Sequence, residues 1–163
     1  KKHIGYYIAF IIIYRLAENE SPSRNDFECY IHEGVEAIKA LFPQYPYDAN
    51  YMGELASKAI ELADNNKSDV ENVESIGGGW TGEEALAIAL YCAVRHFDSF
   101  ENALIAAVNH AGDSDSTGAI TGNILGAAIG YEAIPQFYKD DLEMHDLILH
   151  MADDLYRGEV TKM

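Results

Sequence analysis

Cysteine and proline are scarce in this sequence of 163 residues. The two cysteines, Cys29 and Cys92, provide neither a disulfide framework nor a CxxC motif, and both lie in helix-like apolar patterns. We therefore expect buried free thiols and a reducing, cytoplasmic location. Only four prolines are present, while alanine, leucine and isoleucine are abundant, which favours helices over a many-stranded β-sandwich.

Basic residues are also few, because 11 Lys and Arg stand against 27 Asp and Glu, for a formal charge of −16. The electric field of this negative charge repels the phosphate backbones of nucleic acids, which argues against generic nucleic-acid binding. Strong acidity suits a protein that holds divalent cations, although most of these carboxylates must be solvated surface.

Long apolar runs are missing. The longest, residues 4–14, falls well short of the roughly 20 residues needed to span a bilayer, and no A-x-A-like cleavage site follows it. We expect neither a membrane segment nor a signal peptide. Because the chain enters this run directly after Lys1, Lys2 and His3, without an initiator methionine, we expect a fragment or a processed product.

The remaining composition is that of a folded helical protein. Hydrophobic residues make up 48% of the chain and aromatic residues 11%, which excludes intrinsic disorder. We predict one all-α domain or fragment over residues 1–163, built as a compact multi-helix bundle. The predicted helices cover residues 4–17, 23–41, 52–65, 69–76, 81–96, 100–109, 118–134 and 141–156.

Capping residues mark several of these helix starts. Ser23 or Asn25, and later Ser99, are candidate N-caps, and Thr81 with Glu84 has the spacing of a capping box. Residues 42–47 contain two prolines and are predicted as a rigid connector.

The most informative stretch is residues 109–118, NHAGDSDSTG. Asp113 and Asp115, together with the adjacent hydroxyls, form a compact set of hard oxygen donors, which Mg²⁺, Ca²⁺ or Mn²⁺ prefer. The simpler alternative is that Asp115, Ser116 or Thr117 only caps the following helix. A calcium EF-hand is excluded because its twelfth position, which requires a bidentate Glu, is Ile124.

Two glycine patterns accompany this loop. Glycines recur at every fourth position of the following helix, a spacing that predicts a bare ridge packed closely against a neighbouring helix. These glycines are Gly118, Gly122, Gly126 and Gly130. Upstream, residues 77–79 form a triple glycine before Trp80, which either lets a ligand approach the next helix or is an ordinary flexible turn. Trp80 is either a pocket wall or core.

Together these motifs resemble the ADP-ribosylglycohydrolase family, all-α enzymes that remove ADP-ribose from modified proteins. The similarity lies in GGGW at 77–80, EEALAIAL at 83–90 and NHAGDSDSTGAITGNILGA at 109–127. The resemblance implies a binuclear Mg²⁺ or Mn²⁺ centre with Asp113, Asp115 and Ser116 among its ligands. It also implies substrate binding by Gly78, Gly79 and Trp80, and hydrolysis of the N- or O-glycosidic bond of an ADP-ribosylated protein or a small ADP-ribose conjugate. We assign no catalytic residue.

The departures from the family pattern are equally informative. The family's other ligands come from an N-terminal Thr-Asp-Asp-Thr motif, which is absent from this sequence. We therefore expect the C-terminal portion of such an enzyme, inactive alone and able to associate through exposed core surface. The alternative is a non-catalytic helical interaction module that retains the fold.

Overall fold

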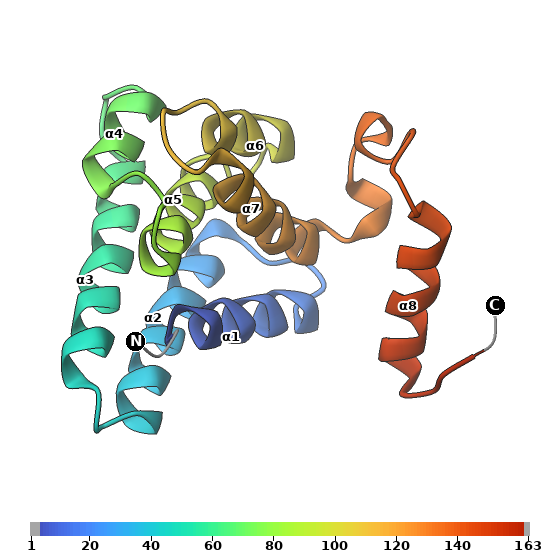
Figure 1. The fold of residues 1–163 in the computed structure, drawn as a ribbon, viewed down its shortest axis with the longest axis horizontal. Helices are drawn as coiled ribbons and strands as arrows, with labels where there is room; N and C mark the ends of the chain where they lie inside the picture. Colours follow the sequence, from blue (N-terminus) through green and yellow to red (C-terminus); the bar gives the residue numbers. More distant parts are fainter. Residues whose placement is uncertain (1–3, 162–163) are drawn as a thin grey trace. The chain divides into compact units, whose positions relative to one another are not determined.

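The computed structural model describes residues 4–161 and confirms the predicted all-α fold (Figure 1). This part of the chain contains eight α-helices and two short 3-10 helices, and no strand. In chain order they are α1 (Ile4–Glu18), α2 (Arg24–Leu41), α3 (Pro46–Ala63), α4 (Asp69–Ile76), α5 (Gly82–Arg95), α6 (Phe100–Val108), α7 (Ser114–Ile129), η1 (Tyr131–Ala133), η2 (Gln136–Tyr138) and α8 (His145–Arg157).

Residue contacts divide the chain into two compact units, with the boundary between Tyr131 and Glu132. The first unit holds α1 to α7 and almost all of the buried core. The second holds η2 and α8, and no residue of the described α8 is buried. Every residue of the candidate site lies in the first unit.

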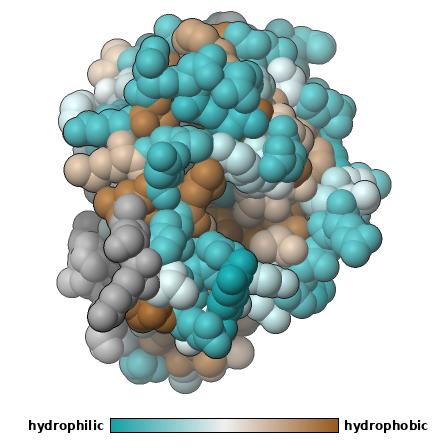
Figure 2. Space-filling model, turned by 90° about the vertical axis from the view of Figure 1, so that its right-hand side faces the viewer, coloured by the Kyte–Doolittle hydropathy of each residue, from teal (hydrophilic) through white to brown (hydrophobic). Residues whose placement is uncertain are grey.

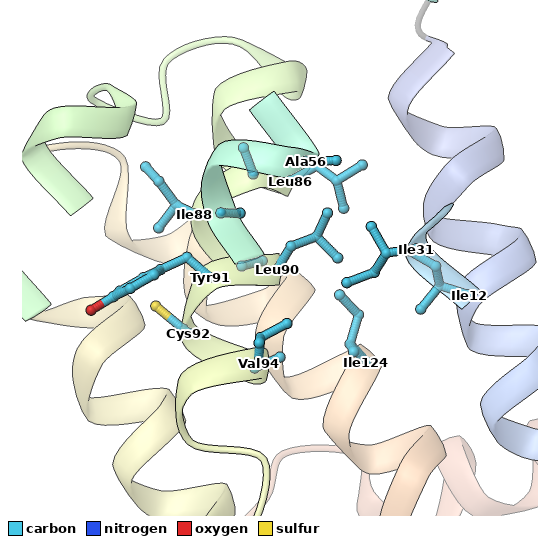
Figure 3. Packing of buried hydrophobic residues seen from close by; sticks show 14 of the residues in the cluster. Ile12, Ile31, Ala56, Leu86, Ile88, Leu90, Tyr91, Cys92, Val94 and Ile124 are labelled. Carbon is cyan, nitrogen blue, oxygen red and sulfur yellow. The ribbon is translucent and has the colours of Figure 1, made fainter. Parts of the chain in front are cut away.

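Helix α5 is the centre of the first unit. Its ten residues from Ala85 to Val94 are all buried, because the sequence is apolar on every side of the helix. It contacts α1, α2, α3, α4, α6 and α7. Figure 3 shows Leu86 and Leu90 pointing into a cluster with aliphatic side chains from other helices, among them Ile31 and Ile124. This buried helix therefore anchors the Gly-rich turn that precedes it.

The predicted caps at Ser23 and Ser99 are confirmed, whereas at Thr81 only the cap itself forms and the described structure has no return bond from the Glu84 side chain to complete the predicted capping box. Ser23 forms a complete capping box with Asp26, and Ser99 accepts a hydrogen bond from the amide of Asn102. The hydroxyl of Thr81 accepts from the backbone N–H of Glu84. These interactions span three residues and satisfy free amides of the first helical turn.

Three helices depart by several residues from their predicted bounds. Helix α3 begins at Pro46, since a proline at the first helical position has no amide hydrogen to leave unpaired. Helix α7 begins at Ser114, inside the segment predicted as loop, and ends at Ile129, where Gly130 adopts a φ of 76°. Helix α8 begins at His145, a few residues later than predicted.

The expectation of two buried thiols is wrong for one of them. Cys92 is buried in α5, and this burial raises the pKa of its thiol. Cys29 is exposed, because α2 is amphipathic and turns Phe27 and Ile31 rather than Cys29 toward the core.

The glycine ridge of α7 is only partly as predicted. Gly118 and Gly122 face α6, where a β-carbon would lie 2.7 Å from Cγ1 of Val108 and 3.7 Å from Cδ2 of Leu104, respectively. Gly118, Gly122 and Gly126 are nevertheless partly exposed, and Gly130 ends the helix. The ridge contacts a neighbour, as expected, but it is not buried.

Hydrophilic residues predominate on the face drawn in Figure 2, with hydrophobic residues in scattered patches. None of the described helices is both long and apolar enough to span a bilayer. Several aromatic side chains of α1 are exposed. They are Tyr6, Tyr7, Phe10 and Tyr14.

Candidate functional site

The two glycine-containing motifs, far apart in the sequence, contact each other directly. The backbone N–H of Asp113 donates a 2.8 Å hydrogen bond to the carbonyl oxygen of Gly78. A β-carbon on Gly112 would overlap with that same carbonyl group. The Gly-rich turn therefore packs on the acidic loop, and only glycine at residue 112 permits this approach.

Gly79 directs the chain from this contact into α5. It is buried and has a φ of 74°, a left-handed conformation that favours glycine. A β-carbon there would lie 3.2 Å from Cγ2 of Thr117 and 3.6 Å from Cβ of Asp113. The turn thus places a bare backbone beside the first turn of α7.

Asp113, Asp115 and Ser116 lie together at the start of α7. Asp113 is the N-cap residue, yet in the described structure its side chain makes no capping hydrogen bond. Asp115 and Ser116 lie in the first turn, where the amide of Ser116 donates to Oδ1 of Asp115 at 2.7 Å. The alternative in which Asp115, Ser116 or Thr117 is the N-cap residue is therefore wrong, because the helix begins earlier.

The electrostatic state of Asp113 suits a ligand. Hydrogen bonding with the Asp115 side chain, and then with Ser116, lowers the pKa of the Asp113 carboxyl below its ordinary value. A metal ligand must be deprotonated, and an aspartate of ordinary pKa already is at neutral pH, so the lowered pKa only extends the deprotonated state to more acidic pH.

A cavity of about 250 Å³ opens beside these residues. Its walls bring Gly79 and Trp80 together with Asp113 and Ser116. Trp80 is 73% exposed, so it is a wall of this cavity and not part of the core. Gly78 lines a shallower neighbouring hollow with His110, and Asp115 is exposed beside the first cavity without lining it.

Sequence reasoning missed most of the other walls. Helix α1 contributes Gly5, Tyr6 and Ala9, and the start of α5 contributes Thr81, Gly82 and Glu83. No short-range pattern signals the residues of α1, because they reach the cavity through the packing of α1 against α5 and α7. Thr81, Gly82 and Glu83 directly follow Trp80, and that adjacency was the available signal. His110 and Thr117 also belong to the site and were not predicted as site residues. Both lie within the acidic motif, and this position was the signal that could have identified them.

The donors in this loop fit a hard divalent cation in kind, since they are two carboxylates and a hydroxyl. They do not make a full coordination shell. Within residues 4–161, no three or more His, Cys, Asp or Glu side chains gather as a metal site would require. Asp113, Asp115 and Ser116 could thus supply only part of a coordination shell.

Comparison with known proteins identifies the family of this all-α chain. Residues 5–162 match the model of the ADP-ribosylglycohydrolase family, and the chain belongs to that family.

The curated relatives are longer proteins. The ADP-ribosylarginine hydrolase Tri1 of Serratia proteamaculans is 39% identical over 64 residues, covering 39% of this chain and 18% of its own length. The human ADP-ribosylhydrolase ARH3 is 27% identical over 81% of this chain and 38% of its own length. The ADP-ribosyl-[dinitrogen reductase] glycohydrolase of Rhodospirillum rubrum is 43% identical over 29% of this chain and 16% of its own length. No solved structure gives a significant match.

Proposed function

We propose that this chain supplies part of a metal-dependent site that hydrolyses the glycosidic bond of ADP-ribosylated substrates. One observation carries the proposal: Asp113 and Ser116 of the acidic loop share a cavity with Gly79 and Trp80 of the Gly-rich turn. Two kinds of hard oxygen donor and an open cavity thereby occur at one place, on two motifs typical of the family.

Each residue has a distinct part in this proposal. Asp113, Asp115 and Ser116 hold Mg²⁺ or Mn²⁺, with the two carboxylates offsetting its charge and the hydroxyl adding a neutral oxygen. Gly78 and Gly79 let substrate approach the backbone, and the exposed indole of Trp80 forms a flat wall against it. The metal, when bound, supplies Lewis-acid polarisation and a more acidic water.

The proposed site is incomplete within this chain. A binuclear centre needs more ligands than two carboxylates and one hydroxyl, so we expect the 163-residue chain to lack appreciable hydrolase activity on its own. The matched segment covers 16–38% of the lengths of the relatives named above, which leaves room in such proteins for the remaining ligands.

The family supports the proposed substrate class. The names of the relatives specify ADP-ribosylated arginine in one case and dinitrogen reductase in another. For this chain we propose an ADP-ribosylated protein or a small ADP-ribose conjugate as the substrate of the complete site.

A second candidate is a non-catalytic interaction module. The exposed aromatic side chains on α1 favour it, because exposed apolar patches often mark protein contacts. The proposed hydrolytic site requires Asp113 and Asp115, whereas the interaction module does not.

Titration with Mn²⁺ tests the first proposal. NMR spectra of the ¹⁵N-labelled chain should show broadening by Mn²⁺ at residues 113–117, and Asp113→Asn should reduce it strongly. The exposed Asp98, between α5 and α6, provides a matched control as Asp98→Asn. Equal broadening in the wild type and Asp113→Asn would refute the metal site and leave the interaction module.

A further inference from the structure

The imidazole of His110 contacts the acidic loop on both of its sides. The backbone N–H of Gly112 donates to Nδ1 of His110 at 3.1 Å. On the other side, Nε2 of His110 lies 3.0 Å from Oγ1 of Thr117. Gly112 immediately precedes Asp113, and Thr117 immediately follows Ser116, so the two contacts enclose the candidate ligands.

These contacts determine the tautomer of His110. A backbone N–H can only donate, so Nδ1 must be an unprotonated acceptor. The neutral ring then carries its hydrogen on Nε2, which donates to the Thr117 hydroxyl. The Thr117 hydroxyl in turn donates to the carbonyl oxygen of Ala107 at 2.6 Å.

The resulting chain of hydrogen bonds joins the acidic loop to α6. Thr117 is completely buried, and Ala107 belongs to the last turn of α6. Because an unpaired polar group at a buried position raises the free energy of the folded state, each donor and acceptor in this series of hydrogen bonds favours one arrangement. His110 is therefore held in one orientation from both ends.

The backbone around Asp113 is fixed by the same network. The amide of Gly112 is bound by His110, and the amide of Asp113 is bound by the carbonyl oxygen of Gly78. The carbonyl oxygen of Asp113 accepts from the amide of Thr117 at 3.2 Å. The peptide groups on both sides of Asp113 are thus constrained, and mainly its side-chain torsions remain to be set.

We propose that His110, as its Nε2–H tautomer, is a positioning residue that fixes the backbone conformation from which the Asp113 carboxylate reaches the cation. This inference about His110 rests on the proposed function, because it requires a cation bound by the acidic loop. A histidine that merely joins α6 to α7 would affect stability alone, whereas a positioning residue changes the conformation and affinity of the loop.

Two variants separate these roles. His110→Ala removes both contacts, whereas His110→Asn places Oδ1 near the position of Nδ1 and can still accept from the Gly112 amide. The matched control is His32→Ala, because His32 is an exposed histidine on α2.

The first measurement needs no metal. ¹⁵N NMR of the full chain should identify the Nε2–H tautomer at His110. The Gly112 amide should exchange with solvent about tenfold faster in His110→Ala, recover in His110→Asn and stay unchanged in His32→Ala. An Nδ1–H tautomer, or an unchanged Gly112 exchange rate in His110→Ala, overturns the proposal. Should His110→Ala fail to fold, the tautomer and the Asn variant still decide it.

The second measurement is the affinity for Mn²⁺. We expect His110→Ala to weaken it about tenfold or more, the usual effect of losing a partner that orients a ligand, and His110→Asn to recover most of that loss. Equal weakening in both variants contradicts positioning through Gly112. If the wild type binds no Mn²⁺, the proposed function fails, and the tautomer and amide exchange alone decide whether His110 orients the loop.

Discussion

The carbonyl oxygen of Gly78 lies against Gly112 and accepts the hydrogen bond from the amide of Asp113. This contact makes one site of two motifs that belong to different parts of the sequence. It places the candidate cation ligands beside the turn that leads to Trp80, and it requires glycine at residue 112.

Gly112→Ala should therefore destabilise the protein by about 1–3 kcal/mol, because the added methyl group must displace the Gly78 backbone. Gly82→Ala is the matched control, since a β-carbon on Gly82 has no neighbour within 4 Å in the described structure. Gly82 is also the first residue of α5, where alanine is acceptable. Urea unfolding measures both variants. Equal stability of the two variants would show that the Gly78–Gly112 contact is not maintained in solution.

Asp115→Asn should leave the free energy of unfolding nearly unchanged, because Asp115 is exposed and is not the N-cap residue of α7. The same change should lower the affinity for Mg²⁺ or Mn²⁺, since an amide oxygen lacks the negative charge of a carboxylate. Calorimetric titration, ideally within a complete site, provides the measurement. Unaltered metal binding there would remove Asp115 from the ligand set.

Local interactions of the fold were predictable from the sequence. The caps at Ser23 and Ser99 depend on residues three positions away, so sequence reasoning could find them. The acidic loop was likewise predicted at the start of a helix. Its helix begins at Ser114 rather than later, because Asp115, Ser116 and Thr117 continue the helical hydrogen bonding instead of ending the loop.

Contacts between distant segments were not predictable in this way. The pairing of Gly78 with Asp113 depends on how α5 and α7 pack, which no short-range pattern encodes. The exposure of Trp80 has the same origin. The tautomer of His110 required the positions of Gly112 and Thr117 in three dimensions.

Gly122 offers a test of the ridge on α7. A β-carbon there would make an ordinary contact, 3.7 Å from Cδ2 of Leu104. Gly122→Ala should therefore stabilise the protein by about 0.5–1 kcal/mol, because alanine favours the helix and meets no obstruction. Gly122→Leu should instead destabilise it, since its further atoms must displace the side chain of Leu104. Thermal unfolding of both variants is the measurement, and destabilisation by alanine would mean that the two helices lie closer together.

A polar network at the far end of α5 has its centre at Tyr91. The buried Tyr91 hydroxyl donates to Oδ1 of Asp69 at 2.6 Å and accepts from Nδ2 of Asn72 at 3.0 Å. Asp69 also pairs with Arg95 at 3.0 Å and contacts His96 at 3.1 Å. Burial, and then the hydrogen bond to Asp69, raises the pKa of Tyr91 above its ordinary value near 10.

Tyr91→Phe should lower the free energy of unfolding by about 1–2 kcal/mol at pH 7, because Asn72 and Asp69 each lose a partner. In the wild type, the unfolded chain ionises Tyr91 from about pH 10, whereas the folded protein resists ionisation. The contribution of its raised pKa is therefore fully present below pH 10 and is lost as the pH rises through the folded pKa.

The difference in stability between wild type and Tyr91→Phe should consequently shrink between pH 9 and pH 11, within the alkaline range in which tyrosine ionises. Urea unfolding at several pH values measures this difference, in which the ionisation of Cys92 cancels because both proteins contain it. Tyr14→Phe, at an exposed position on α1, is the control and should differ little in stability from the wild type. A difference for Tyr91→Phe that stays constant to pH 11 would mean that Tyr91 titrates alike in the folded and unfolded chains.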